Sequence, residues 1–134
     1  MKTLVVEDDF SSRLLLQEFL KPYGAVHIAV NGKEAIEAVR AAATAHDPYN
    51  LICLDITMPE MNGHAALKEI RGFEESRGIP SSQASKIFMI TAVDDIQNVF
   101  EGFRGLCDAY IVKPLERAKL TEQIRVCGLG QLGP

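Results

Sequence analysis

Five short, mostly apolar runs are spaced along the chain. Runs of four to six residues with no polar alternation are typical of strands that are buried on both faces of a sheet. The second run is less apolar than the others, which favours a strand at the sheet edge. The five predicted strands cover residues 3–6, 25–29, 51–54, 86–90 and 109–112.

Between these runs, apolar residues recur at three- and four-residue spacing, which predicts amphipathic helices. We expect Ser11 and Ser12 to offer the cap of the first helix, and Leu14, Leu15 and Leu16 to lie in the core. The remaining helices are expected from about Lys33, from about Gly63, after Ala92 and across residues 115–126.

Strand and helix therefore alternate five times along the chain. This order predicts an α/β fold, in which a doubly wound parallel sheet carries helices on both faces. A chain of 134 residues suits a single domain with an adequate core. We expect this domain to cover residues 1–128, and the glycine-rich residues 129–134 to form a short loose tail.

Composition and charge exclude several classes of protein. A net charge of −4 and a pI near 5.3 argue against direct binding of nucleic acid, which usually needs a basic face. The three cysteines, Cys53, Cys107 and Cys127, contain no CxxC pair, so neither a zinc site nor a disulfide framework is indicated. Reduced thiols, with no signal peptide and no stretch long enough to span a membrane, predict a cytoplasmic protein without membrane insertion.

Polar side chains follow four of the five predicted strands. Because the carboxyl ends of parallel strands lie at one edge of a sheet, these side chains should come together where open α/β sheets bind ligands. A single aspartate at a strand end could equally start a turn. The group delivered to this edge contains Glu7, Asp8 and Asp9 after the first strand, Asp55 after the third, Thr91 after the fourth and Lys113 after the fifth.

Such a group of acids needs a cation. Two carboxylates about 4 Å apart repel each other by roughly 4 kcal/mol at an effective dielectric constant near 20. Either one of them is protonated or a cation joins them, and carboxylate oxygens suit Mg²⁺ before any softer metal. An ionised aspartate can also attack phosphorus, and Lys113 with Mg²⁺ could neutralise the transferring group. The hydroxyl group of Thr91 could donate a hydrogen bond to it.

This pattern resembles the receiver domain of two-component response regulators along nearly the whole chain. The resemblance is carried by residues 5–9, 54–63, 91–92 and 110–114. It implies a five-stranded sheet of flavodoxin-like order 2-1-3-4-5, whose switch point lies between the first and third strands. The segment 73–85 looks longer than in a typical receiver, so we expect it to extend the third helix and the following loop.

Position by position, the resemblance implies a role for each residue of the acid group. Asp55 is the expected phosphoacceptor. Glu7, Asp8, Asp55 and the backbone carbonyl of Thr57 are expected to hold Mg²⁺, with Asp8 binding it directly and Glu7 through water. Asp9 lies just beyond this pair, and we expect it only to cap the helix that follows.

The resemblance also implies a set of residues that respond to the phosphoryl group. Thr91 matches the switch hydroxyl, Tyr110 the switch aromatic and Lys113 the lysine that contacts phosphate. The Lys113–Pro114 peptide bond matches one that is commonly cis. Thr91 could also cap a helix, and Tyr110 could be a packing aromatic with its hydroxyl at the surface. Residues beside the phosphoryl position, expected to tune dephosphorylation, are Thr57 and Val93.

The expected function is a phosphorylation switch that is not an enzyme beyond its own phosphotransfer and dephosphorylation. A phosphohistidine of a sensor kinase or phosphotransfer protein would donate to Asp55, and a protein partner would read the face formed by the fourth helix, fifth strand and fifth helix. The chain length predicts a stand-alone receiver. One alternative is a phosphohydrolase of the haloacid dehalogenase type, but that family uses a second aspartate two residues after the first, and this chain has Thr57 at that position. The other is a receiver that serves as a constitutive binding module.

Overall fold

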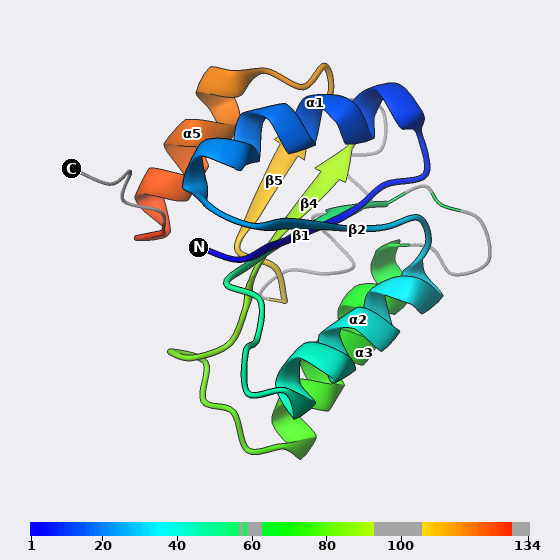
Figure 1. The fold of residues 1–134 in the computed structure, drawn as a ribbon, viewed down its shortest axis with the longest axis vertical. Coiled ribbons are helices and arrows are strands. Elements are labelled where there is room, and N and C mark those ends of the chain that lie inside the picture. The colour runs from blue at the N-terminus through cyan, green and yellow to red at the C-terminus, as the bar shows by residue number, and fades with distance from the viewer. Residues whose placement is uncertain (57, 59–62, 93–105, 130–134) are drawn as a thin grey trace.

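A computed structural model describes residues 1–56, 58, 63–92 and 106–129 (Figure 1). The fourth predicted helix falls on residues 93–105, outside the described residues. The elements in chain order are β1 (Thr3–Val6), α1 (Phe10–Leu20), a 3-10 helix η1 (Lys21–Tyr23), β2 (Val26–Ala29), α2 (Gly32–Thr44), β3 (Leu51–Asp55), α3 (Gly63–Ser76), β4 (Lys86–Thr91), β5 (Ala109–Val112) and α5 (Arg117–Val126).

All five strands join one parallel sheet in the order β2-β1-β3-β4-β5, which confirms the predicted fold class and strand order. The less apolar strand β2 lies at an edge, as its composition indicates. The register pairs Val6 with Leu54, so β1 and β3 end side by side at the centre of the sheet. Residues that follow these two strands are therefore neighbours in space.

The sheet separates two hydrophobic clusters, because successive strand residues point to opposite faces. Val5, Cys53 and Phe88 belong to the cluster that also contains buried residues of α1 and α5. Leu4 and Met89 belong to the cluster shared with α2 and α3. Figure 1 shows the same division, with α1 and α5 on one face and α2 and α3 on the other. Both faces are covered, as a doubly wound sheet requires.

Helix α1 differs from the prediction at two points. Its cap is Asp9, whose Oδ2 accepts a hydrogen bond from the N–H group of Ser12 at 2.9 Å. The serines therefore do not cap the helix, whereas the expected capping role of Asp9 is confirmed. Leu14 and Leu15 are 48% and 44% exposed, so the prediction that they lie in the core is wrong. Each helical residue turns the side chain by about 100°, so of three consecutive leucines only Leu16 faces the sheet.

Helix α3 continues to Ser76, and a turn at Arg77 and Gly78 then leads into the connection before β4. The longer segment after residue 73 thus contributes both to α3 and to this connection. No helix in the described ranges is long and apolar enough to cross a membrane.

Candidate functional site

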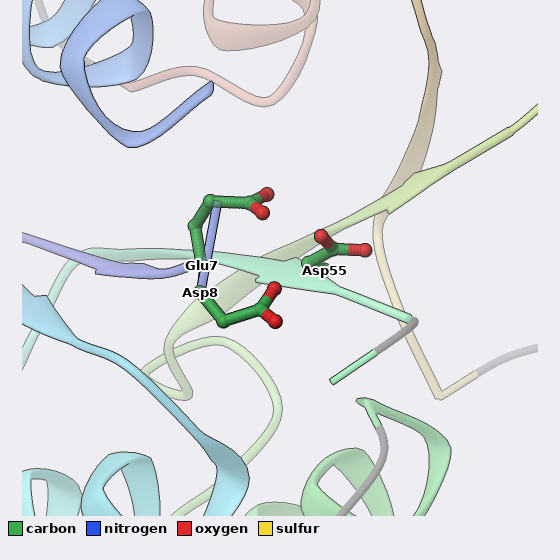
Figure 2. A group of neighbouring side chains, drawn as sticks. All are labelled: Glu7, Asp8 and Asp55. Carbon is green, nitrogen blue, oxygen red and sulfur yellow. The ribbon is translucent and has the colours of Figure 1, made fainter. Parts of the chain in front are cut away.

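Three carboxylates meet where β1 and β3 end. Glu7 and Asp8 directly follow β1, and Asp55 is the last residue of β3. Figure 2 shows their side chains directed toward a common space. One oxygen from each carboxylate lies within 4.8 Å of the other two, with Glu7 and Asp55 buried and Asp8 exposed. The predicted acid group is therefore assembled at the carboxyl edge of the sheet.

Glu7 is the most constrained of the three acids, with a side chain that is fully buried. Its Oε1 accepts a hydrogen bond from the N–H group of Asp9 at 3.1 Å. Its Oε2 is buried and has no hydrogen-bond partner among the described residues. Burial, together with the neighbouring Asp55, raises the pKa of Glu7 to about 8. At neutral pH this carboxyl group therefore needs either a proton or a cation.

Lys113 supplies one positive charge to this group. It follows β5, and its Nζ lies 3.5 Å from Asp55 Oδ2 and 3.9 Å from Glu7 Oε2. Its N–H group donates a hydrogen bond to the carbonyl of Thr91 at 2.8 Å, which fixes the end of β5 beside β4. The Lys113–Pro114 peptide bond is cis, as the resemblance implies. In the part of the chain that the structure describes, the ion pairs of this site join one lysine to a group of three carboxylates, which leaves a net negative charge there that suits a cation.

Thr91 and Tyr110 lie on the same face of the sheet. Tyr110 pairs with Met89 and Val112 pairs with Thr91, and residues two apart on a strand point to one face. Thr91 is buried at the end of β4, and its Oγ1 donates a hydrogen bond to the carbonyl of Ala92 at 3.1 Å. The Tyr110 hydroxyl is buried rather than at the surface. The two residues are diagonal neighbours, as a coupled pair would need to be.

The remaining predicted site residues, Thr57 and Val93, lie outside the described residues. Their expected roles at the metal and in dephosphorylation stay predictions.

The structure adds Gly63 to the site, where the sequence predicted only the start of a helix. The N–H group of Gly63 donates a hydrogen bond to the carbonyl of Ile56 at 2.9 Å. A Cβ atom at position 63 would lie 2.3 Å from the Asp55 carbonyl oxygen. The first residue of α3 therefore packs directly against the backbone of Asp55, and only glycine leaves the necessary space. A glycine that opens a helix soon after a strand-end acid was the available signal.

Arg13 is a second residue that the sequence did not single out. Its Nη1 donates a hydrogen bond to the backbone carbonyl of Glu7 at 3.3 Å. Its guanidinium group also lies over the ring of Phe10, 5.5 Å from the ring centre. Arg13 thus steadies the backbone of Glu7 from α1. The signal in the sequence was a basic residue in the first turns of the helix that follows the acids.

The donor set favours a hard cation. Carboxylate oxygens alone, with no sulfur or imidazole among them, suit Mg²⁺ rather than a softer metal. The buried Oε2 of Glu7, which lacks a hydrogen-bond partner among the described residues, fits a position that a hydrated cation would serve. The same edge presents a carboxylate nucleophile at Asp55 beside a lysine, which is an arrangement suited to phosphoryl transfer.

Comparison with known proteins points to one family. The family model described as the response regulator receiver domain matches residues 3–125. The transcriptional regulatory protein ZraR of Klebsiella oxytoca is 36% identical over 118 residues, which are 87% of this chain and 24% of that protein. The probable transcriptional regulator ycf27 of Cyanophora paradoxa is 32% identical over 125 residues, which are 92% of this chain and 46% of that protein. The chain thus spans a quarter to a half of the length of these relatives.

Three solved structures with the same fold contain a bound protein or metal ion. A CheX–CheY–BeF3–Mg complex from Borrelia burgdorferi matches with a TM-score of 0.77 and 27% identity, covering 96% of this chain and 90% of the matched chain. A complex of the phosphotransfer protein Ypd1 with the receiver domain of Ssk1, from Saccharomyces cerevisiae, matches with a TM-score of 0.74 and 26% identity. The match covers 92% of this chain and 86% of the matched chain. The receiver domain of PA1611 from Pseudomonas aeruginosa, with magnesium in its active site cleft, matches with a TM-score of 0.73 and 25% identity. The match covers 95% of this chain and 97% of the matched chain.

Proposed function

This chain belongs to the response regulator receiver family, and we propose that Asp55 is the phosphoacceptor through which it switches. Receiver domains are regulatory phosphoacceptor domains of two-component systems rather than classical enzymes. The observation that carries the proposal is the position of Asp55. It is the last residue of the central strand β3, and it lies within reach of two further carboxylates and of Lys113.

Asp55 would act as a nucleophile toward a phosphohistidine. A carboxylate oxygen of Asp55 forms the new O–P bond while the N–P bond of the donor histidine breaks. Lys113, whose Nζ lies 3.5 Å from Asp55 Oδ2, would balance negative charge on the transferring group. The donor would be a sensor histidine kinase or a phosphotransfer protein. The similarity to a receiver domain crystallised with the phosphotransfer protein Ypd1 supports this class of partner.

Glu7, Asp8 and Asp55 would hold Mg²⁺ at the carboxyl edge. The proximity of their oxygens and the buried Oε2 of Glu7 both fit this ion. When bound, Mg²⁺ supplies positive charge that offsets the charge of phosphoryl oxygens. The backbone carbonyl of Thr57 is a further expected ligand. The magnesium in the active site cleft of the PA1611 receiver domain supports the same assignment.

Thr91, Lys113 and Tyr110 would convert phosphorylation into a change of shape. A phosphoryl group adds a charge of about −1.5 to −2 and strong acceptor oxygens beside Lys113. Each charge-assisted hydrogen bond is worth roughly 1.5–3 kcal/mol, enough to reverse a balance of a few kcal/mol between two states. Thr91 would turn toward the phosphoryl group and Tyr110, on the same sheet face, would follow. A protein partner would then read the face that contains β5, α5 and the fourth predicted helix.

The two alternatives are less well supported. A phosphohydrolase of the haloacid dehalogenase type needs a second aspartate where this chain has Thr57, and the family match is to receiver domains. A constitutive binding module has no use for three carboxylates clustered at the carboxyl edge of the sheet. An intact constellation of Glu7, Asp8, Asp55 and Lys113 instead favours a working phosphoacceptor.

Incubation with acetyl phosphate and Mg²⁺, followed by intact-mass measurement, tests the proposal. We expect a mass increase of one phosphate group that Asp55→Asn abolishes. Asp9→Asn is the matched control, since asparagine also caps helices and Asp9 is assigned no part in the chemistry. Retention of the mass increase in Asp55→Asn, or none in the wild-type protein, would overturn the assignment. Steady turnover of a small phosphate ester would favour the hydrolase.

A further inference from the structure

We propose that two copies of this chain associate through the open side of β2, where their sheets join into one continuous sheet. β2 stands at the end of the strand order, so among the described residues only β1 pairs with it. A strand in this position presents N–H and C=O groups with which another strand can pair. The inference concerns a different part of the molecule from Asp55 and does not rest on phosphorylation.

The hydrogen bonds from β1 show which groups of β2 point outward. The N–H group of Glu7 donates a hydrogen bond to the carbonyl of Ala29 at 3.0 Å. Backbone groups alternate in direction along a strand, so those of His27 and Ala29 face β1. Those of Val26 and Ile28 therefore point away from β1. Each copy offers two N–H groups and two carbonyls on this side.

A second copy related by a two-fold axis can satisfy all of these groups at once. In an antiparallel pair of β2 strands, Val26 of one copy lies opposite Ile28 of the other, and the two residues exchange both hydrogen bonds. The axis then passes between the two copies of His27. This pair has no hydrogen bonds of its own, and its Cα atoms lie about 4.5 Å apart.

Other registers would need backbone groups that already have partners. A shift toward the start of β2 would use Gly24, whose N–H group donates to the Lys21 carbonyl at 3.3 Å. A shift toward its end would use Val30, whose N–H group donates to Glu34 Oε1 at 3.0 Å. The register with His27 on the axis therefore uses the free groups and no others.

Helix α1 forms a groove beside the open side of β2. The groove has a volume of about 320 Å³, and the residues that line it are Leu14, Gln17, Glu18, Lys21, Gly24 and Val26. Leu14 is 48% exposed, although it lies on a helix that packs against the sheet. A second copy joined at β2 would cover this apolar surface, which gives the contact a side-chain component beyond the strand hydrogen bonds.

The charges of the groove are self-complementary. Glu18 and Lys21 lie three residues apart on α1, and neither belongs to an ion pair within the described residues. The two-fold axis reverses the direction of α1 in the second copy, so the acid-to-base order of one helix runs against the base-to-acid order of the other. One charge of each sign suits a second copy better than an acidic or a basic peptide.

Such a dimer would leave the signalling parts of the molecule accessible. β5 lies at the opposite end of the strand order from β2, and Glu7, Asp8 and Asp55 lie at the carboxyl ends of β1 and β3. Two copies joined at β2 would therefore present two acid sites and two β5 faces in one particle, with or without a phosphoryl group.

A cysteine at position 27 tests the register. We expect His27→Cys to form a disulfide-linked dimer in air, because a Cα separation of about 4.5 Å lies within the range that disulfides span. Non-reducing electrophoresis and intact mass measure the product. Glu37→Cys, at an exposed position of α2, is the matched control, and the wild-type protein controls for the three native cysteines.

Sedimentation equilibrium over a range of protein concentrations tests the association itself. We expect a reversible dimer in the wild-type protein. Ile28→Pro removes one outward N–H group from each copy, so it should raise the dissociation constant about tenfold or more. Because this N–H group does not bond to β1, proline is compatible with the fold there, which circular dichroism checks. Ile28→Val shortens the side chain but keeps the N–H group, and it should dimerise as the wild-type protein does.

A wild-type protein that is monomeric at every concentration overturns the inference, even if an extended peptide binds to it. A dimer that Ile28→Pro leaves unchanged, or cross-linking as fast in Glu37→Cys as in His27→Cys, also overturns it. If Ile28→Pro does not fold, the comparison of the two cysteine variants decides. Phosphorylation of Asp55 is measured separately by mass, so neither proposal stands or falls with the other.

Discussion

The two edges of the sheet carry charged side chains in opposite ways. At the carboxyl edge, Lys113 Nζ lies 3.5 Å from Asp55 Oδ2 and 3.9 Å from Glu7 Oε2, in a group of three carboxylates that also contains Asp8. At the amino edge, Arg71 of α3 pairs with Glu74 at 2.6 Å and with Asp108 at 3.0 Å, and Lys86 lies 3.8 Å from Asp108. Arg71 Nη1 also donates a hydrogen bond to the Ser85 carbonyl at 2.8 Å, and we name Arg71, Glu74, Ser85 and Asp108 the Arg71 clamp. Within the described residues, three acids outnumber the lysine paired with them at the carboxyl edge, which we call the incomplete edge, whereas acids and cations are equal in number at the amino edge, which we call the closed edge.

This difference distinguishes a site from a structural network. Buried charges that are fully hydrogen-bonded and paired hold elements together, and they leave little for a ligand to do. A buried charge without a compensating partner is unfavourable, and binding of a proton or a cation, or a covalent modification, can stabilise it. We assign the phosphoacceptor chemistry proposed above to the incomplete edge and a structural role to the closed edge. The predictions below test each side of this contrast.

The largest effect is expected from opening the closed edge. Arg71→Ala leaves the buried Glu74 carboxylate without the guanidinium group that pairs with it at 2.6 Å, and loss of one partner of a buried pair costs about 3–5 kcal/mol of unfolding free energy. Urea unfolding measures this. Arg125→Ala is the matched control, because Arg125 and Glu122 pair at the same 2.6 Å and the same helical spacing but are 71% and 56% exposed. A loss in Arg125→Ala as large as that in Arg71→Ala would contradict the assignment of the Arg71 clamp as structural.

The sequence could predict one edge and not the other. Glu7, Asp55 and Lys113 come together because parallel strands end at a common edge, a rule that needs only the strand ends. The Arg71 clamp joins a helix residue, a connection and a loop, whose meeting depends on side-chain reach and loop path. No period in the sequence specifies those.

The same limit explains the other differences. A cluster of leucines at Leu14 to Leu16 identifies a helix, but the face that it buries depends on how the helix is set against the sheet. The role of Gly63 depends on the loop that returns it to the Asp55 carbonyl. The parallel sheet and the acid site, by contrast, follow from local pattern and from the common edge at which parallel strands end, whereas the strand order came from the resemblance to receiver domains.

Gly63 offers a test of how tightly the incomplete edge is built. Gly63→Ala places a Cβ atom 2.3 Å from the Asp55 carbonyl oxygen, so we expect a loss of about 1–3 kcal/mol in unfolding free energy and slower phosphorylation. Gly72→Ala, in the same helix, has open space and should be neutral or stabilising by up to about 1 kcal/mol. Equal stability of the two variants by urea unfolding would show that α3 does not press on Asp55.

The raised pKa of the buried Glu7 carboxyl group should make the free energy of unfolding depend on pH. The folded pKa of Glu7 is about 8, above its ordinary 4.5, so the protonated folded form is favoured at low pH. This contribution is complete below pH 4.5 and is lost as pH rises toward 8, because the unfolded chain releases the proton first. Without Mg²⁺, the wild-type protein should therefore lose roughly 1–2 kcal/mol between pH 5.5 and 7.5 relative to Glu7→Gln.

Thermal or urea unfolding of both proteins across this range measures the difference, with exposed Glu37→Gln as the control variant. Addition of Mg²⁺ should narrow the gap, because a cation replaces the proton at the carboxyl edge. Parallel pH profiles for the wild-type protein and Glu7→Gln would show that Glu7 is not held protonated.

The smallest effect on the fold should come from the one exposed acid. Asp8 lies at the surface of the group, so Asp8→Ala should change the unfolding free energy by no more than about 0.5 kcal/mol. It should still weaken Mg²⁺ binding about tenfold, which corresponds to about 1.4 kcal/mol, because a carboxylate ligand is lost. Calorimetric titration with Mg²⁺ measures the affinity, and Asp9→Asn should bind as the wild-type protein does. An unchanged titration in Asp8→Ala would show that Asp8 is not a metal ligand, so that Glu7 and Asp55 would be the only acids of the group left to bind the cation.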